Sequence, residues 1–206
     1  MPELPEVETV VRELSSMLIG RAISTSIIVD KEKFPNLKRR IPEGDIIVDV
    51  VRRGKNIVLV FSNAKILVFH LRMTGRLLYS EKREERSHIR ARFELTEGFL
   101  DFCDVRRFGT IEVKDSLAEL KNAPDIIADP NFQPEDFYRL LSRRKKPIKS
   151  LLLDQDFIVG VGNIYASEAL YSARILPMTD ASMIGRARSD KLYRELKRIF
   201  LEAIEC

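Results

Sequence analysis

The chain has 206 residues, which is long enough for one large domain or two small ones with a substantial buried core. Hydrophobic residues make up 45% and charged residues 32%, which excludes a disordered chain, and no apolar run approaches the roughly 20 residues that a membrane span needs. The net charge of +4 suits a polyanionic partner, although many basic proteins bind no nucleic acid.

The N-terminal segment predicts a helix. Apolar residues recur at three- and four-residue spacing from Val7 to Leu18, and Gly20 stands where a C-terminal cap belongs. Several glutamates and Pro5 suit the beginning of such a helix.

From Ala22 to about Val113 the pattern changes to short β-rich runs. In Ile89–Leu95 apolar and charged residues alternate, which indicates a strand with one solvated face. The spacing of the runs favours a sandwich or a barrel, with hairpin connections at 62–64 and 96–98. The predicted strands are Ala22–Val29, Asp45–Val51, Asn56–Phe61, Lys65–Leu71, Ile89–Leu95, Phe99–Asp104 and Thr110–Val113.

The last third of the chain predicts helices, after a linker of mixed polarity. The predicted helices are Pro134–Ser142, Pro147–Leu153, Asn163–Ser172 and Ser189–Ile204. Lysines and arginines in the last of them add positive charge.

Met1-Pro2 is the first pair with chemical potential. Methionine before a small residue is normally removed, which would give Pro2 a free secondary amine. An α-amino group titrates near 7.7–8.0, so on the order of a tenth of it is unprotonated at neutral pH. Attack of this amine on a sugar C1′ gives an iminium intermediate, and Glu3 beside it could serve as a general acid. Met-Pro is also a common start, and Glu3, Glu6 and Glu8 also favour a helix N-terminus, so the residues alone leave both interpretations open.

The sequence MPELPEVET at 1–9 resembles the N-terminal signature of the formamidopyrimidine-DNA glycosylases, bacterial enzymes that remove oxidised purines. Four further stretches match the same family in order: RRGKNIVL at 52–59, HLRMTGRL at 70–77, DVRRFGT at 104–110 and DQDFIVGVGNIYASEALY at 154–171. The resemblance thus spans essentially the whole chain. Leu4 favours this branch over the related endonuclease VIII branch, which usually has glycine there.

The resemblance implies an α+β fold: an N-terminal helix on a two-sheet β-sandwich, followed by a helical domain with a helix–two-turn–helix. We expect the catalytic helix and the sandwich in 1–115, the linker in 116–131, and the helical DNA-binding domain in 132–206. DNA is expected to run through the basic cleft between them.

The resemblance also implies roles for individual residues. Pro2 is expected to be the Schiff-base nucleophile, Glu3 the catalytic acid, and Lys55 a phosphate contact that assists strand cleavage; Glu6 is a possible further site residue. The remaining residues expected to contact DNA are His70, Met73, His88, Arg106, Phe108, Arg144, Lys149 and Asn163.

Three of these residues, Met73, Arg106 and Phe108, match the side chains that fill the gap left by a flipped-out nucleotide. Taken alone, Met73 and Phe108 would instead suit a core. The turn Gly160-Val161-Gly162-Asn163 matches the helix–two-turn–helix, where free N–H groups can face a phosphate.

The chain departs from the family pattern at three points. Arg72 stands where glycine is common, and Val105 where proline is common. The family continues into a zinc finger with four cysteines, whereas this sequence stops at Cys206, and one terminal cysteine makes no tetrahedral zinc site. We therefore expect no metal site and no cofactor in these residues, with lyase activity on abasic DNA retained and excision of intact damaged bases weak.

The implied function is base-excision repair of oxidised purines by a bifunctional glycosylase and abasic-site lyase, through β,δ-elimination at a Pro2 Schiff base. The alternatives are a non-catalytic protein that binds lesions or abasic sites, and the same chemistry on oxidised pyrimidines. We expect a monomer that acts on double-stranded DNA, with no membrane contact. The acidic N-terminal segment argues against a signal peptide, so we expect a cytoplasmic, nucleoid-associated bacterial protein.

Overall fold

The structure is a computed structural model that describes residues 1–120 and 123–205. The described residues form two compact units: the first holds Met1–Pro2 and Val7–Leu120, and the second holds Glu3–Glu6 and the described residues that follow position 120. Residues 121–122 of the predicted linker, and Cys206, lie outside the described residues. The predicted linker contributes to both units, because the 3-10 helix η1 (Leu117–Glu119) belongs to the first and Ile126 is buried in the core of the second.

Helix α1 (Leu4–Leu18) forms because its apolar residues return every three or four positions. Val7, Val11, Leu14 and Leu18 are buried in the core of the first unit, whereas Met17 at the end of the helix is exposed. Gly20 follows the helix with φ +88°, the left-handed conformation that glycine adopts readily, so the predicted cap is confirmed.

The eight strands of the described chain form two four-stranded antiparallel sheets. One sheet has the order β1-β6-β7-β5, from strands β1 (Ile23–Ile28), β6 (Ile89–Leu95), β7 (Phe99–Asp104) and β5 (Gly75–Ser80). The other has the order β2-β3-β4-β8, from strands β2 (Ile47–Arg53), β3 (Asn56–Phe61), β4 (Ile66–His70) and β8 (Thr110–Lys114).

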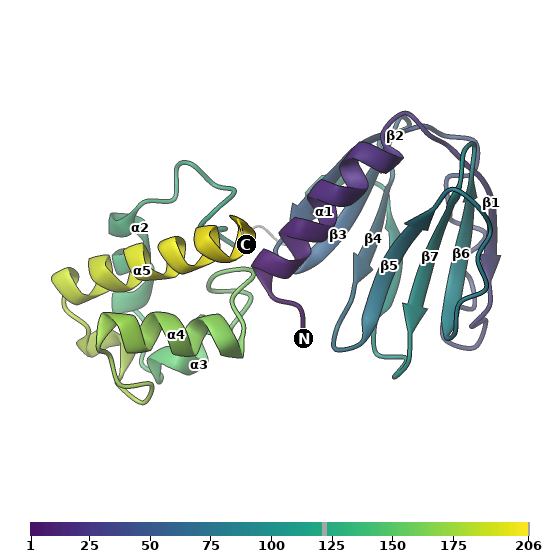
Figure 1. The fold of residues 1–206 in the computed structure, drawn as a ribbon. Helices are drawn as coiled ribbons and strands as arrows, with labels where there is room; N and C mark the ends of the chain where they lie inside the picture. The colour runs from purple at the N-terminus through teal and green to yellow at the C-terminus, as the bar shows by residue number, and fades with distance from the viewer. Residues whose placement is uncertain (121–122, 206) are drawn as a thin grey trace. The chain divides into compact units, whose positions relative to one another are not determined.

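The inner faces of both sheets and one face of α1 share a single core, so the expected helix on a two-sheet sandwich is confirmed. Figure 1 shows the two sheets as two layers of the first unit. Hairpins join β3 to β4 and β6 to β7 at the predicted connections. Strand β5 is absent from the predicted strands; its Gly75 begins the strand directly after a tight turn that ends in a hydrogen bond from Gly75 N to Leu71 O.

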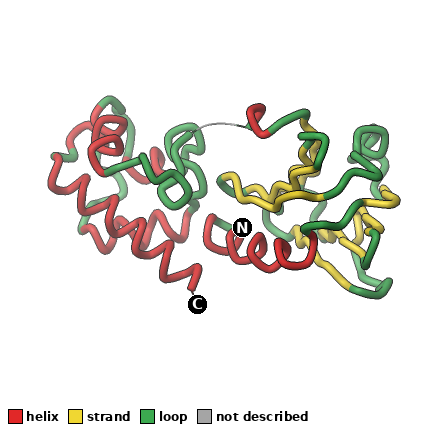
Figure 2. The backbone as a smooth tube through the Cα atoms, turned by 90° about the horizontal axis from the view of Figure 1, so that it is seen from above, coloured by secondary structure: helices red, strands yellow, loops and turns green. Residues whose placement is uncertain are grey.

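The second unit is helical, with helices α2 (Pro134–Ser142), α3 (Ile148–Leu152), α4 (Asn163–Ala173) and α5 (Arg186–Glu205) and the short 3-10 helix η2 (Ala181–Met183). Figure 2 shows these helices in red, in contrast to the yellow strands of the first unit. Their apolar faces share one core, in which Leu4 of α1 is completely buried. In the part of the chain that the structure describes, every helix is too short or too polar to cross a membrane.

Candidate functional site

The side chain of Glu3 lies at the N-terminus of α4, within the second unit. It is 3% exposed, and its carboxyl oxygens accept hydrogen bonds from the backbone N–H groups of Gly162 (2.8 Å), Ile164 (2.9 Å) and Tyr165 (3.3 Å). The first N–H groups of a helix have no partner inside the helix. Glu3, 159 or more positions away in the sequence, supplies that partner, so α4 fixes the carboxyl group in place. The expectation that the N–H groups at this turn are free to face a phosphate is therefore wrong for Gly162, Ile164 and Tyr165, because these groups bond to Glu3.

The glycines of the turn before α4 leave the space that this arrangement needs. A Cβ atom on Gly162 would lie 2.2 Å from Cδ of Glu3, and one on Gly160 would lie 2.6 Å from the Leu4 side chain. Gly160 also has φ +90° and accepts a 3.0 Å hydrogen bond from Leu4 N. The Gly-Val-Gly turn therefore allows the beginning of α1 to approach its backbone closely.

Glu6 has a positioning role. One carboxyl oxygen accepts from Glu3 N (2.8 Å) and the other from the hydroxyl of Tyr165 (2.7 Å). The first of these bonds is the backward contact that a third helical residue makes to its own N-terminal cap. Burial, followed by the hydrogen bond to Glu6, raises the pKa of Tyr165, which stays a neutral donor. Tyr165 was not singled out from the sequence, although it lies in the matching stretch 154–171.

Pro2 immediately precedes Glu3 and is partly exposed. Its nitrogen forms an amide while Met1 is attached, and that amide has no N–H and no nucleophilic lone pair. Removal of Met1 would convert the same atom into a secondary amine next to the fixed Glu3.

Within the first unit, Lys55 lies in the turn between β2 and β3 and is 7% exposed. Its neighbour Asn56 is paired in register with His70 at the end of β4. Burial, with the positive charges of Arg72 and Lys55, lowers the pKa of His70 to about 4. Nδ1 of His70 accepts a 3.0 Å hydrogen bond from Arg72 N, so the neutral ring carries its proton on Nε2.

The three residues expected to fill the gap in the base stack do lie together in the first unit. Arg106 Nη1 is 3.3 Å from the Met73 sulfur, and the Arg106 guanidinium lies 4.6 Å from the centre of the Phe108 ring. Met73 is 51% exposed and Phe108 is 49% exposed, so neither is a core residue. An exposed Met-Arg-Phe cluster of this kind is suited to stacking on bases.

A buried carboxylate joins the two loops that carry this cluster. Asp104, which is 1% exposed, accepts hydrogen bonds from Gly109 N (2.7 Å), Arg106 N (3.2 Å) and the hydroxyl of Thr74. The Thr74 oxygen also accepts from Arg106 N (3.2 Å). Burial alone would raise the pKa of Asp104, but these hydrogen bonds outweigh it and keep the pKa below its ordinary value. Thr74 and Asp104 were missed in the sequence, although both lie in stretches quoted for the family.

Between Arg106 and Phe108, Arg107 adopts the left-handed conformation with φ +58°. Its guanidinium lies 2.8 Å from carboxylate oxygens of Asp30 and Glu32. Burial works against the charged form of Asp30, but the hydrogen bond from Arg107 is the largest influence and lowers the pKa of Asp30. Arg107 therefore anchors the loop while its two neighbours stay in the exposed cluster.

The second unit brings several of its expected DNA-contacting residues to the beginning of α4. Lys149 Nζ lies 2.9 Å from Ser167 Oγ, and Ser167 in turn donates to the carbonyl of Asn163 (2.8 Å). Asn163 is exposed at the first position of α4. Arg144 is exposed just after α2.

His88 is exposed and has φ +61°, and its carbonyl accepts a 3.0 Å hydrogen bond from Asp104 N. The site residues thus form one group around Glu3 in the second unit and another around Lys55, His70 and the Met-Arg-Phe cluster in the first. Within residues 1–120 and 123–205, no three His, Cys, Asp or Glu side chains are grouped so that they could hold a metal ion.

Comparisons with known proteins agree with this geometry. Residues 1–111 match the formamidopyrimidine-DNA glycosylase N-terminal domain, and residues 123–206 match the formamidopyrimidine-DNA glycosylase H2TH domain. The chain is 42% identical over 210 residues to the formamidopyrimidine-DNA glycosylase of Solibacter usitatus, and 38% identical over 217 residues to that of Streptococcus agalactiae. In both cases the alignment covers 100% of this chain and 78% of the relative.

Solved structures give the same result. The Lactococcus lactis enzyme bound non-covalently to DNA with an abasic site superposes with a TM-score of 0.88 at 30% identity, over 98% of this chain and 82% of that one. MutM in complex with DNA that contains carbocyclic 8-oxo-G gives 0.89 at 31% identity, over 99% and 80%. The MutM protein of Thermus thermophilus gives 0.87 at 35% identity, over 99% and 76%. With both domains matched and relatives of this similarity, the chain belongs to the formamidopyrimidine-DNA glycosylase family.

Proposed function

We propose that this protein is a base-excision repair DNA glycosylase that removes oxidised purines and then cleaves the abasic strand as a lyase. The observation that carries the proposal is the fixed position of Glu3: three backbone N–H groups hold its carboxyl group directly beside Pro2 in the sequence. An acid held this firmly next to a potential secondary amine fits covalent amine catalysis.

In the proposed reaction, the lone pair of the Pro2 nitrogen attacks C1′ of the damaged nucleotide. The bond from C1′ to the base breaks, and the base leaves with the bonding electrons and a proton. Attack leaves the Pro2 nitrogen with its own proton, which passes to the departing base. Glu3 protonates O4′ as the sugar ring opens, so that an iminium remains between Pro2 and C1′. Loss of a C2′ proton then expels the 3′ phosphate, loss of a further sugar proton expels the 5′ phosphate, and water hydrolyses the iminium to free Pro2. None of these steps requires a redox or nucleotide cofactor.

The first unit would contribute Lys55 and His70. With a pKa of about 4, His70 is neutral at physiological pH and presents its Nε2–H as a donor, while Lys55 supplies positive charge. A donor and a cation close together suit a phosphate of the DNA backbone. We assign this pair to the phosphate next to the extruded nucleotide.

The Met-Arg-Phe cluster would occupy the gap that the extruded nucleotide leaves. Extrusion of a base costs a few kcal/mol, and side chains that enter the stack offset part of that cost. Arg106 can also donate to the orphaned base of the opposite strand, with Met73 and Phe108 stacked on either side. Its contact with both neighbours holds the three side chains as one wedge.

The helical unit would bind the DNA backbone. The start of α4 presents Asn163, with Lys149 close by and Arg144 on the preceding connection. Contacts of this kind set the position of the protein on the duplex and make binding depend on salt. We propose double-stranded DNA as the partner of a monomeric protein in the bacterial cytoplasm, at the nucleoid.

Borohydride trapping tests the nucleophile. Protein whose Met1 has been removed should form a covalent complex with abasic DNA, and mass spectrometry should place the adduct on Pro2. Protein that retains Met1 should bind the same DNA without an adduct, since its Pro2 nitrogen is an amide. An adduct on Lys55, with Pro2 unmodified, would contradict the assignment.

Excision of 8-oxoguanine and thymine-glycol duplexes, measured side by side, separates the proposal from its alternatives. Preferential release of 8-oxoguanine supports the proposal. Preferential release of thymine glycol would indicate the same chemistry on oxidised pyrimidines. Tight binding of both duplexes without turnover or trapping would indicate a non-catalytic lesion-binding protein.

A further inference from the structure

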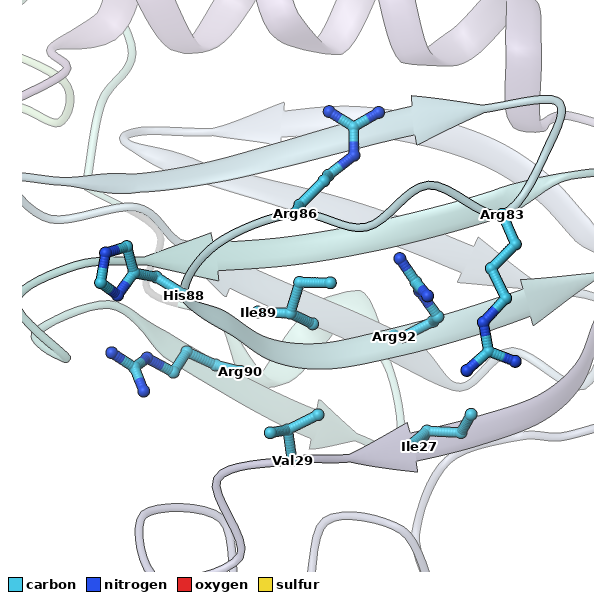
Figure 3. A pocket seen from close by; sticks show the side chains of 8 residues that line it. All are labelled: Ile27, Val29, Arg83, Arg86, His88, Ile89, Arg90 and Arg92. Atoms are coloured by element: carbon cyan, nitrogen blue, oxygen red, sulfur yellow. The ribbon is translucent and has the colours of Figure 1, made fainter.

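A hollow of about 480 Å³ lies on the outer face of the β1-β6-β7-β5 sheet, away from the core of the sandwich. It is lined by three aliphatic side chains, four arginines and His88, and Figure 3 shows them over the strands. No carboxylate belongs to its lining. The arginines therefore determine which ligand charge the hollow could accept.

Three of the four arginines are paired with carboxylates. Arg92 makes two hydrogen bonds, of 2.6 and 2.7 Å, to the fully buried Asp101 directly opposite it on β7. Arg86 lies 2.7 Å from Glu84 and 3.4 Å from Asp101, and Arg83 lies 3.8 Å from Glu94. Each of these three guanidinium groups thus lies beside a carboxylate, and the contacts of Arg86 and Arg92 hold the connection before β6 against the sheet.

Arg90 differs from the other three. Its Nε donates to the carbonyl of Asp104 (2.8 Å) and its Nη2 to the carbonyl of Val105 (3.4 Å). Within residues 1–120 and 123–205 it forms no ion pair with a carboxylate. The charge of Arg90 contributes to the lowered pKa of Asp30, but both Asp30 oxygens already accept hydrogen bonds from Arg107. The Arg90 guanidinium is thus fixed in position, with its Nη1 not used in these bonds.

His88 lies at the same end of the hollow as Arg90, and Figure 3 shows both side chains there, with Arg83 at the opposite end. Both residues are hydrogen-bonded to the backbone of Asp104: its N–H donates to the His88 carbonyl, and its carbonyl accepts from Arg90. His88 has φ +61° and is exposed, and a non-glycine residue in that conformation is often found at functional sites.

We infer that Arg90 binds a phosphodiester of the DNA strand that passes the Met-Arg-Phe cluster, beside the DNA contact already expected of His88, with Arg90 as the charged partner. This inference rests on the proposed function. A fixed, planar guanidinium without a carboxylate partner is well suited to a phosphate.

The same hydrogen bonds also connect Arg90 to the loop that carries Arg106. The carbonyls that hold its guanidinium belong to Asp104 and Val105, the two residues directly before Arg106. A phosphate on Arg90 is therefore linked through two hydrogen bonds to the loop that carries the wedge. Binding of that phosphate therefore determines where Arg106 lies along the DNA strand.

Binding of duplexes that contain a stable abasic-site analogue tests the inference, with Arg90→Gln compared with the matched control Arg83→Gln from the opposite end of the hollow. Arg90→Gln is expected to weaken binding roughly tenfold, about 1.4 kcal/mol, and to reduce the salt slope by about one unit. Arg83→Gln is expected to change neither quantity. Circular dichroism melting of both variants checks that they fold.

A series of duplexes with one neutral methylphosphonate each then identifies the phosphate. At one position the effect of Arg90→Gln should disappear, because that phosphate no longer carries the charge that Arg90 binds. A loop that merely lost its support would weaken binding equally at every position, and that result would overturn the inference. Equal effects of Arg90→Gln and Arg83→Gln would also overturn it. Failure of the proposed function itself would appear separately, as absence of trapping by the unsubstituted protein.

Discussion

The carboxyl group of Glu3 takes the place of a cap that α4 does not have in its own sequence. Gly162 occupies the capping position and has no side chain, so the first N–H groups of α4 turn to Glu3 instead. An ordinary capping side chain stabilises a helix by about 1 kcal/mol. Here the same hydrogen bonds also fix the group proposed as the acid.

Gly162→Ala tests this dependence without touching a group proposed to meet the substrate. The added methyl would occupy the position of the Glu3 carboxyl group, whereas a methyl on Gly185 would meet nothing within 4 Å. We expect Gly162→Ala to reduce excision of 8-oxoguanine at least a hundredfold, in the range seen for loss of a positioned acid. Gly185→Ala should keep near-normal activity, and equal activity of both variants would contradict the proposed role of Glu3.

His70 allows a prediction about pH. Its pKa falls from about 6.5 in the unfolded chain to about 4 in the folded protein. Between these values the unfolded chain binds a proton that the folded protein does not, so stability falls as pH drops from 6.5 to 4. His70→Gln should flatten this part of the stability curve, measured by thermal melting. Because the chain has only two histidines, an NMR titration with His88→Gln as the assignment control can follow His70 directly.

At the scale of elements, the Met-Arg-Phe cluster lies on two loops, and a hydrogen bond between Thr74 and Asp104 joins these loops. Thr74 follows Met73 on the turn before β5, and Asp104 ends β7 just before Arg106. Their hydrogen bond, with the bonds from Arg106 N to both side chains, holds the two loops together.

Thr74→Val removes the hydroxyl while keeping the shape of the side chain. Because it leaves Asp104 with one donor fewer in a buried place, we expect a loss of about 1–3 kcal/mol in the free energy of unfolding. Affinity for lesion duplex should fall several-fold more than affinity for undamaged duplex, since only the former requires the wedge. Thr25→Val, at an exposed position on β1, is the control. Equal losses on both duplexes would show that the hydrogen bond does not position the wedge.

The local sequence pattern predicted most helices and strands, but it did not predict which of them pair or pack together. The alternation in Ile89–Leu95 and the three- and four-residue spacing in α1 reflect faces buried in one core, so both were found. β5 was missed because Gly75 and Arg76 weaken its apolar pattern, and its pairing with β7 is a long-range contact. The strand order β1-β6-β7-β5 depends on such contacts and leaves no local signal.

In the candidate site, too, the sequence identified individual residues but not the partners that hold them in place. Pro2, Glu3 and Lys55 were identified because they lie in contiguous stretches that resemble the family. The partners that fix Glu3 lie about 160 positions away, and Tyr165 shows its role only when folding brings it to Glu6. Arg90 was only one of the charged residues in the alternating pattern of Ile89–Leu95, because its lack of an ion pair depends on which carboxylates surround it in the fold.

At the scale of the whole chain, helix α1 contributes to two separate cores. Leu4, at its first position, is completely buried in the core of the helical unit. From Val7 onward, the residues of its inner face are buried in the core of the sandwich, and among them Leu14 is 3% exposed. Glu3 directly precedes Leu4, so its position depends on the helical unit rather than on the sandwich.

The same substitution at the two ends of α1 should therefore have different effects. Replacing a buried leucine by alanine costs about 2–5 kcal/mol, and the loss falls on the core that surrounds the residue. Leu4→Ala should accelerate amide hydrogen exchange in α4 and α5 and reduce excision, because the contacts of Leu4 with the Gly160 turn help to hold Glu3 at α4. Leu14→Ala should accelerate exchange in the strands and leave α4 and α5 protected. Exchange that rises equally in both units for both variants would show that the two cores unfold together, and that Leu4 has no specific role in placing Glu3.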